Sequence, residues 1–360
     1  MEYKVKDAVS ELVYRDIEEI ADTQMIPWEK LEGKTVLITG AAGFISYYMV
    51  LAFLLRNDKY QSGIKVAGLV RSTQRARAKY GNIAEREDFI LFEQDVCEPF
   101  ALDFGADYVI HAASQASGIQ FEQDPVGTIN ANLAGTVQLL EYAKKSRSES
   151  VLLISSLKVY GKVTDGSQKL TEEKSGYLDQ TSYKNCYAVG KRAMETLGAS
   201  YHKQYGMNIR IARPSYIYGP SSLNDDRVWA QFIANVVKGE DILLKSNGGA
   251  YRSFCYVTDT VRALLVILLK GENMQPYNIA SEKSDVTIRN FAKTAVQVFP
   301  EKNLKLSFFN KEDEAEPVVD YSVQTPEIMD STRLEALGWS AMVDLAEGIR
   351  RSVSIVAERS

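Results

Sequence analysis

Apolar positions along the chain follow two different periods. From residue 34 onward, short continuous apolar runs alternate with stretches in which apolar residues recur every three or four positions. The continuous runs cover residues 36–38, 66–70, 89–92, 108–110, 151–154 and 209–211. A strand that is apolar throughout is buried on both faces, which is typical of a parallel sheet covered by helices. We therefore predict an α/β fold built on a doubly wound parallel sheet of the Rossmann type.

Two segments lie outside this alternation. Residues 4–21 carry apolar side chains at helical spacing, which predicts an amphipathic helix ahead of the first strand. That helix would either bind a partner or pack on its own domain. After Pro214 the pattern loosens, and turn-forming pairs such as Gly219 and Pro220 interrupt it. The later chain therefore predicts a smaller second domain.

The composition is that of an ordinary globular protein with a sizeable core, because 45% of the 360 residues are hydrophobic and 25% are charged. The net charge of −5 suggests no basic face, so we expect no nucleic-acid partner. Residues 1–16 are charged throughout and lack an apolar signal core. The longest apolar run, residues 263–269, is too short to cross a membrane, so we expect no membrane partner.

Cysteine and histidine usage bears on metals and on redox compartment. Cys97, Cys186 and Cys255 are odd in number and far apart, so they form neither a disulfide framework nor a zinc cluster. Such cysteines favour a reducing, cytoplasmic location. His111 and His202 are the two histidines of the chain, which excludes a His-rich metal site, and we expect no metal.

The first predicted strand runs directly into a glycine-rich turn. Gly40 and Gly43 follow that strand and precede an apolar helix. Glycine lets the backbone approach a pyrophosphate, and the helix then directs its N-terminal amides at the anion. Ser46 stands where a third glycine would assist packing between helix and strand, and serine is small enough to preserve it. The turn therefore predicts a dinucleotide site.

The end of the second predicted strand bears on the choice of dinucleotide. An acidic residue there favours NAD because it binds the adenosine ribose, whereas an arginine accommodates the 2′-phosphate of NADP. The strand ends with Arg71 and Ser72 and carries no carboxylate, so the sequence favours NADP. Asp95 and Val96, after the third strand, stand where a contact to the adenine is expected.

Tyr187 and Lys191 are candidate catalytic residues, because a spacing of four places them on one face of a helix. Positive charge from the lysine and from a nicotinamide cation lowers the pKa of a tyrosine. Such a tyrosine can remove a hydroxyl proton while a hydride leaves the same carbon. Ser156 follows the predicted strand at 151–154, and its hydroxyl is expected on the ligand side of the sheet.

Together these motifs resemble the extended short-chain dehydrogenase/reductases, the group of nucleotide-sugar epimerases, dehydratases and decarboxylases. The resemblance runs from about residue 34 to near the C-terminus. Ser156, Tyr187 and Lys191 match the catalytic triad of that family. The residues that match its cofactor turn and the loop after its fourth strand, and for which the resemblance implies cofactor contacts, are Gly40, Ala42, Gly43, Phe44, Ile45, Ala112, Ala113 and Ser114.

The resemblance implies roles for these residues. Tyr187 would be the base, Lys191 would lower its pKa and hold the nicotinamide ribose, and Ser156 would hydrogen-bond the reacting oxygen. Arg252 would grip the substrate diphosphate, which suits the bidentate geometry of a guanidinium. The implied ligands are a nucleotide-sugar and NAD(P).

The resemblance also implies an assembly and a division of the chain. In this family two helices per subunit commonly pair into a dimer interface, so we expect a homodimer or a larger even oligomer. Here those helices would be the one at 132–145 and the one that carries Tyr187. We expect an N-terminal helical extension over 1–33, a dinucleotide-binding domain over 34–212 that the chain rejoins at about 250–270, and a mainly substrate-binding domain over 213–360.

Some positions depart from the family pattern. Residues 111–117, 124–136 and 186–196 resemble in particular the UDP-glucuronate decarboxylases, but these carry a glutamate where Lys158 stands. Hexose 4,6-dehydratases carry an Asp-Glu pair in place of Leu157 and Lys158. Tyr216 replaces an asparagine of the family, and with Lys158 it is a candidate substrate contact. Lys158 would bind a carboxylate or phosphate of the substrate, or else lie in solvent.

The residues that move a hydride at a sugar carbinol are therefore present, whereas the acids for loss of water are missing. This favours an epimerase that acts through a transient ketone. Dehydration, decarboxylation and net oxidation or reduction within the same family are the alternatives. A dinucleotide-binding protein without turnover is an alternative from another class, but it would not need Ser156, Tyr187 and Lys191 together.

Overall fold

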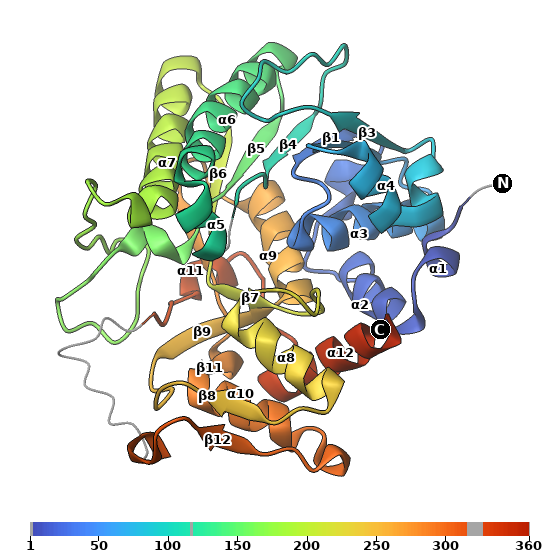
Figure 1. The fold of residues 1–360 in the computed structure, drawn as a ribbon. Coiled ribbons are helices and arrows are strands. Elements are labelled where there is room, and N and C mark those ends of the chain that lie inside the picture. Colours follow the sequence, from blue (N-terminus) through green and yellow to red (C-terminus); the bar gives the residue numbers. More distant parts are fainter. Residues whose placement is uncertain (1–2, 116–117, 315–326, 360) are drawn as a thin grey trace.

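A computed structural model describes residues 3–115, 118–314 and 327–359 of the chain (Figure 1). The helices are α1 (Val5–Ala8), α2 (Glu11–Ala21), α3 (Phe44–Tyr60), α4 (Thr73–Tyr80), α5 (Gly118–Gln123), α6 (Pro125–Ser146), α7 (Cys186–Tyr205), α8 (Val228–Lys238), α9 (Val257–Lys270), α10 (Ile288–Gln297), α11 (Thr332–Glu335) and α12 (Leu345–Glu358). The 3₁₀ helices are η1 (Trp28–Leu31), η2 (Gly81–Glu85), η3 (Leu157–Tyr160), η4 (Tyr183–Asn185), η5 (Glu282–Ser284), η6 (Pro300–Lys302) and η7 (Lys311–Glu314).

The strands form one large sheet and two small ones. They are β1 (Thr35–Thr39), β2 (Lys65–Val70), β3 (Phe89–Glu93), β4 (Tyr108–His111), β5 (Ser150–Ile154), β6 (Ile209–Pro214), β7 (Tyr216–Tyr218), β8 (Ile242–Leu244), β9 (Tyr251–Tyr256), β10 (Pro276–Ile279), β11 (Asp285–Thr287) and β12 (Leu306–Phe308). The large sheet has seven strands in the order β3-β2-β1-β4-β5-β6-β10, all of them parallel. The predicted parallel sheet is confirmed, and its order reverses direction beside β1.

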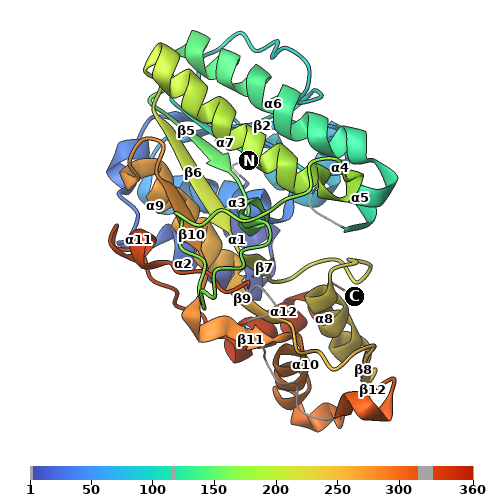
Figure 2. The same ribbon diagram turned by 90° about the vertical axis from the view of Figure 1, so that its left-hand side faces the viewer.

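Helices cover both faces of this sheet, as the continuous apolar runs require (Figures 1 and 2). Alternate strand residues point to opposite faces. Leu37 and Val109 pack in the cluster that includes α6 and α7. Val36 and Ile110 pack in the cluster that includes α3 and α9. The central strands therefore bury both of their faces, whereas the edge strand β3 leaves Ile90 53% exposed.

The N-terminal segment differs in part from the prediction of one helix over residues 4–21. The structure has two helices, because Ser10 caps α2 by accepting a hydrogen bond from the backbone N–H of Val13. Val13 and Ile17 are buried, and α2 contacts α3, α9 and α12. The segment therefore packs on its own domain.

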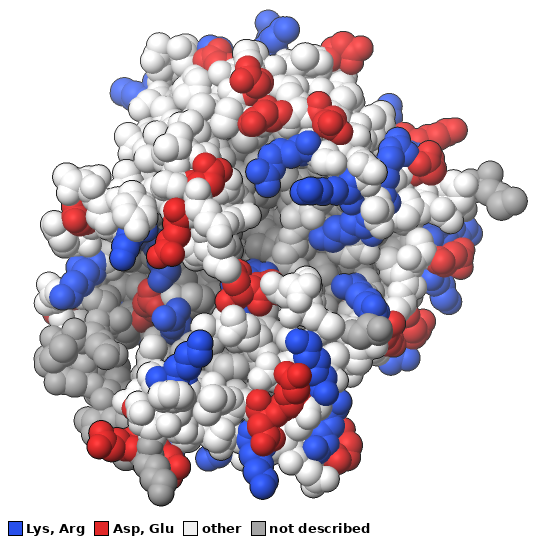
Figure 3. Space-filling view, in the orientation of Figure 1, with Lys and Arg blue, Asp and Glu red and all other residues white. Residues whose placement is uncertain are grey.

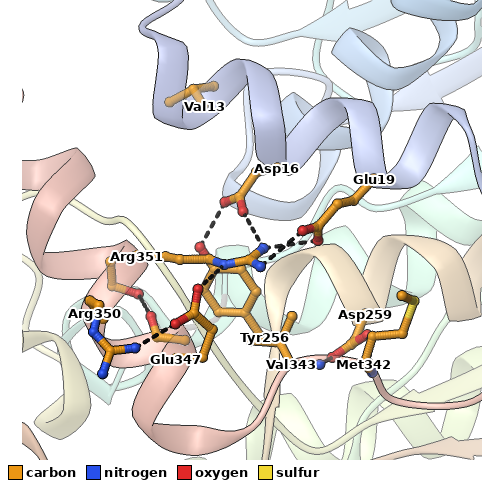
Figure 4. Close-up of polar contacts among 12 residues, drawn as sticks. Val13, Asp16, Glu19, Tyr256, Asp259, Met342, Val343, Glu347, Arg350 and Arg351 are labelled. Carbon is orange, nitrogen blue, oxygen red and sulfur yellow. Dashed lines mark hydrogen bonds and ion pairs between the residues drawn. The ribbon is translucent and has the colours of Figure 1, made fainter. Parts of the chain in front are cut away.

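A polar network joins α2 to the end of the chain (Figure 4). The carboxylate of Asp16 is buried, and it accepts hydrogen bonds from the hydroxyl of Tyr256 at 2.7 Å and from Arg351 at 3.0 Å. Arg351 also donates to both carboxylate oxygens of Glu19 and to Glu347. The network therefore ties three elements that lie far apart in the sequence: α2, β9 and α12.

The smaller sheets lie below the large one in Figure 1. β9 pairs in parallel with β7 and antiparallel with β11, while β8 pairs in parallel with β12. Helices α8, α10 and α12 pack together beside them. Within the part of the chain that the structure describes, no helix combines the length and apolar character of a membrane span, and no group of three or more His, Cys, Asp and Glu side chains is placed to hold a metal ion.

Candidate active site

The glycine-rich turn lies at the reversal point of the sheet, between β1 and α3. Gly40 has a φ of 66°, and a Cβ atom added there would lie 2.9 Å from Cα of Ala113. The backbone N–H groups of Ala112 and Ala113 donate to Oγ1 of Thr39, which holds the loop after β4 against the turn. Glycine is therefore required at position 40, and the turn leaves backbone close to the crevice where dinucleotides bind in sheets of this kind.

The helix that follows the turn is suited to an anion. Gly43 precedes the first residue of α3, Phe44, so Phe44 and Ile45 lie in its first turn with backbone amides free of intrahelical partners. Ser46 is buried, as its predicted packing role requires. These features fit the pyrophosphate of a dinucleotide.

Lys79 of α4 was not identified from the sequence, but it lies against this turn. Its ammonium donates to the carbonyl oxygens of Ala42 at 2.9 Å and of Gly43 at 3.3 Å. Although the residue as a whole is exposed, desolvation of its ammonium and the positive charge of Arg359 lower its pKa to about 8. Figure 3 shows Lys and Arg side chains gathered on the α4 side of the hollow at the centre of this face. This side of the crevice is therefore cationic.

The predicted adenosine contacts lie at the ends of β2 and β3. Arg71 is exposed, and Ser72 caps α4 by accepting from the N–H of Arg75 at 3.3 Å. Glu93, at the end of β3, brings a carboxylate to the same edge, where it accepts from the backbone N–H and the hydroxyl of Thr73 at 2.7 and 2.6 Å. The sequence interpretation, which considered β2 alone, missed this carboxylate.

Asp95 and Val96, the predicted adenine contacts, and Ser114, a predicted cofactor contact, each have neighbours within the chain. Asp95 caps its own turn by accepting from the N–H of Cys97. Val96 is buried, and its methyl groups lie 3.0 Å from where a Cβ of Gly135 would be. Ser114 is half-buried and donates to the side-chain oxygen of Asn132 at 3.1 Å.

The three predicted catalytic residues come together at the carboxyl end of β5. Ser156 begins η3, and its hydroxyl accepts from the N–H of Lys158 at 3.2 Å and hydrogen-bonds the hydroxyl of Tyr187. Lys191 lies one turn further along α7, with its Nζ atom 5.6 Å from the centre of the Tyr187 ring. The Lys191 ammonium is buried and donates to the carbonyl of Ile154 at 2.7 Å.

Burial affects the pKa of both ionisable groups in this triad. Burial raises the pKa of Tyr187, and the hydrogen bond from Ser156 and the charge of Lys158 offset only part of that rise. Burial also lowers the pKa of Lys191 to about 7. Burial therefore opposes the predicted lowering of the tyrosine pKa, because desolvation disfavours the charged phenolate.

Phe121 of α5 is a further neighbour that sequence reasoning missed. Its ring stacks on that of Tyr187, with centroids 4.9 Å apart and planes inclined by 21°. In the same helix the N–H of Ile119 donates to Asp226, which precedes α8, at 3.4 Å. Helix α5 therefore covers one face of the tyrosine and reaches the smaller part of the molecule.

The three predicted substrate contacts also come together. The ammonium of Lys158 donates to the hydroxyl of Tyr216 at 2.8 Å, and the guanidinium of Arg252 lies 4.4 Å from the centre of the Tyr216 ring. Glu327 joins them, with one carboxylate oxygen 2.5 Å from Lys158. This glutamate lies 169 residues from Lys158 in the chain, and no sequence motif marks it.

A cavity of about 430 Å³ opens beside this cluster. Its wall includes Leu157 and Lys158, which follow Ser156, and Asn185 and Ala188, which flank Tyr187 in the chain. Glu327 lies on the wall as well. The cavity therefore lies beside the chain segments that carry Ser156 and Tyr187, and Lys158 and Glu327 of the charged cluster line it.

The chain matches known proteins over most of its length. Residues 36–280 match the model of the NAD dependent epimerase/dehydratase family. UDP-glucuronic acid decarboxylase 6 from Arabidopsis thaliana is 33% identical over 316 residues, which cover 87% of this chain and 86% of that protein. UDP-glucuronic acid decarboxylase 1 from Xenopus tropicalis is 29% identical over 321 residues, which cover 89% of this chain and 71% of that protein.

Solved structures share the fold. The UDP-glucuronic acid 4-epimerase from Bacillus cereus, solved with UDP-glucuronic acid and NAD, superposes with a TM-score of 0.73 at 22% identity and covers 91% of this chain and 100% of its own. The dTDP-glucose 4,6-dehydratase from Bacillus anthracis, solved with NAD, gives 0.70 at 19% identity and covers 91% and 97%. With the family model and the relatives above, these matches show that the chain belongs to the NAD-dependent epimerase/dehydratase family of nucleotide-sugar enzymes.

Proposed function

We propose that the protein is an epimerase that inverts one carbinol of the sugar in a nucleotide-sugar. The observation that carries this proposal is the grouping of Ser156, Tyr187 and Lys191 at the carboxyl end of β5, next in the chain to residues that line the cavity. When bound at the turn, the dinucleotide supplies the chemistry of accepting a hydride and returning it. The residues of this chain then transfer the proton and hold the sugar in position.

In this proposal the hydroxyl of Tyr187 takes the proton of the reacting sugar hydroxyl. Ser156 hydrogen-bonds both the tyrosine and the sugar oxygen, which fixes the distance over which the proton moves. Because burial raises the pKa of Tyr187, the tyrosine works as a base only when positive charge is brought next to it. Lys158 is a cation whose charge lowers the pKa of Tyr187, and Lys191, 5.6 Å from the centre of the ring, adds to that effect when it is protonated.

The absence of proton-transferring side chains directly after Ser156 supports epimerisation over loss of water. Those positions are Leu157 and Lys158. Glu327 does bring a carboxylate to the cavity, but it is held by hydrogen bonds. Although burial raises the pKa of Glu327, Lys158 and Arg252 hold it below the ordinary value. A carboxylate of that kind is a weak base.

The experiment that tests the reaction is incubation of the purified protein with UDP-, dTDP-, CDP- and GDP-linked hexoses and hexuronates, followed by product mass and NMR. A new stereoisomer of unchanged mass is the expected product. A mass change of two hydrogens would indicate net oxidation or reduction instead. Loss of water or of carbon dioxide would contradict the proposal.

We also propose that the protein prefers NADP to NAD. The support is the absence of a carboxylate at the end of β2, where Arg71 and Ser72 stand. Glu93 is the opposing feature, although Thr73 engages its carboxylate. Titration of the verified apo-protein with both dinucleotides is the test, and tighter binding of NAD would refute the preference.

We further propose that the protein forms a homodimer, or a larger even oligomer, through α6 and α7. These helices pack against each other on one face of the sheet, and Ile129, Leu133 and Val137 recur every four residues on α6 without being fully buried. Light scattering at micromolar concentration is expected to give a dimer, and Leu133→Glu is expected to shift it toward monomer. A wild-type monomer would exclude this assembly.

The working compartment that we propose is the cytoplasm. The support is that Cys97, Cys186 and Cys255 are all free thiols in the structure. Fractionation of the source cells is the test, and recovery of the protein outside the cytoplasm would contradict it.

A further inference from the structure

The carboxylate of Glu327 is bound by a complete set of donors. Its Oε1 atom accepts from the ammonium of Lys158 at 2.5 Å, and its Oε2 atom accepts from the hydroxyl of Tyr216 at 2.6 Å. The guanidinium of Arg252 lies 3.5 Å from Oε2. Burial lowers the pKa of Lys158, but the neighbouring carboxylate outweighs burial and raises it overall. Lys158 and Glu327 therefore form an ion pair at neutral pH.

The backbone holds Glu327 in this place. Residue 327 forms a β-bridge with Arg252 of β9, and its carbonyl accepts from the N–H of Ser253 at 3.0 Å. Two residues later the N–H of Met329 donates to the hydroxyl of Ser253 at 3.0 Å. On the other side Leu170 bridges to Met329. Glu327 is thus a fixed part of the wall and not a side chain on a free tail.

The cavity beside this pair is balanced in charge. Among its described lining residues two are cationic and two are anionic: Lys158, Lys162, Asp179 and Glu327. Arg252 adds one positive charge, 3.5 Å from Glu327, and the family resemblance implies that this charge binds the diphosphate of the substrate. With a diphosphate on Arg252, the ion pair of Lys158 and Glu327 would carry no net charge.

We propose that Glu327 is a specificity-determining residue that excludes sugars bearing a carboxylate, so that the cavity takes the neutral hexose of a nucleotide-sugar. The inference rests on the proposed function and concerns the sugar class at the same site. Glu327 neutralises Lys158 and accepts hydrogen bonds, which suits the hydroxyl groups of a neutral sugar. A substrate carboxylate would meet a like charge that the backbone holds in place, and repulsion of that kind discriminates strongly between ligands.

The decisive variant is Glu327→Gln, which keeps the shape of the side chain and removes its charge. Lys158 then lies beside the cavity without a carboxylate partner, so a substrate carboxylate is attracted where it was repelled. Exposure of the pair to water moderates the effect. We expect the ratio of UDP-glucuronate affinity to UDP-glucose affinity to rise at least about tenfold.

A matched control is Glu282→Gln. Glu282 is also paired with a lysine, Lys169, but both side chains are well exposed and neither lines the cavity. This variant should leave the ratio unchanged. Lys158→Gln is the opposite change, because it removes the cation and leaves the carboxylate, and it should lower the ratio.

The measurement is the dissociation constant of UDP-glucose, UDP-glucuronate and UDP alone for the four proteins by calorimetry, with kcat/KM for any sugar that is converted. Wild-type protein should bind UDP-glucose more tightly than UDP-glucuronate. If the wild-type protein prefers UDP-glucuronate, and Glu327→Gln leaves that preference unchanged or strengthens it, then Glu327 does not exclude acidic sugars. That result would leave the proposed function standing. Weaker UDP-glucuronate binding in Glu327→Gln would also overturn the exclusion of acidic sugars. Failure of all three compounds to bind would overturn the proposed function, and the inference with it.

Discussion

Arg351 offers a direct test of the network that joins the N-terminal helix α2 to the C-terminal helix α12 (Figure 4). We consider Arg351→Leu, which keeps much of the aliphatic side chain and removes the guanidinium. Asp16 would keep its hydrogen bond from Tyr256 but lose the cation 3.0 Å away. Glu19 would lose its paired donors as well.

The magnitude follows from burial. The side chain of Asp16 is 1% exposed and that of Arg351 is 24% exposed. Removing one partner of a fully buried ion pair costs about 3–5 kcal/mol. Because water reaches Arg351, we take the lower end, about 3 kcal/mol. An unfolding entropy of about 2.1 cal/mol/K per residue over 360 residues gives about 0.76 kcal/mol/K, so the melting temperature should fall by about 4 °C.

The assay is urea and thermal unfolding of wild type, Arg351→Leu and the neighbouring Arg350→Leu. Arg350 pairs with the same Glu347 but is 52% exposed, so its loss should cost at most about 0.5 kcal/mol. If Arg351→Leu destabilises the protein no more than Arg350→Leu does, the network is not a stabilising contact.

The pH dependence supplies a second criterion. Burial raises the pKa of Asp16 from 3.8 to about 6, although Tyr256 and Arg351 lower it in part. A carboxyl group with a raised folded pKa contributes its stability fully below pH 3.8 and loses it as the pH rises through 6. Without Arg351 the charged form is still less favourable. The penalty of Arg351→Leu should therefore be larger at pH 8 than at pH 5, and equal penalties would refute the reasoning.

Three further predictions concern the active site. Tyr187→Phe should lower kcat at least about a hundredfold with dinucleotide affinity nearly unchanged, and near-normal turnover would remove Tyr187 as the base. Gly40→Ala should weaken dinucleotide binding at least tenfold in a fluorescence titration, because its Cβ would lie 2.9 Å from Ala113 and its φ is 66°. Lys191→Met tests the depressed lysine pKa of about 7: the stability of wild type relative to this variant should rise between pH 7 and pH 10, whereas a constant difference would show an ordinary lysine.

The sequence predicts best those features that are determined by residues close together in the chain. Strands that are buried on both faces have continuous apolar runs, so the parallel sheet can be predicted from the sequence alone. Gly40 is needed because of its own φ and one close neighbour, and Tyr187 and Lys191 share a helix face by spacing alone. The family match confirms the predicted family and enzyme class. The domain division and the individual residue roles stay predictions.

The features that the sequence does not give are set by burial and by contacts between distant segments. Spacing places Lys191 beside Tyr187, but it does not reveal that both are desolvated, and desolvation opposes the expected lowering of the tyrosine pKa. Lys79 lies in the second turn of α4, the helix that Ser72 caps directly after β2. Its position near the glycine-rich turn could therefore have been inferred from helical spacing. No comparable spacing leads to Phe121 or Glu327.

The charged cluster shows why an isolated substitution is hard to interpret from sequence. At position 158 alone, lysine in place of a glutamate suggests an inverted charge and therefore an anionic ligand. In the fold, Glu327, which is 169 residues away in the sequence, places a negative charge beside Lys158. The charged side chains that line the cavity therefore balance. The role of a charged residue can therefore be interpreted only together with its ion-pair partner. Here the β-bridge between Arg252 and Glu327 positions that partner, and no residue near Lys158 in the sequence does so. The chemistry of this site is accordingly set by the pairing of two segments, and a charge-reversing change at either one should be judged by what remains at the other.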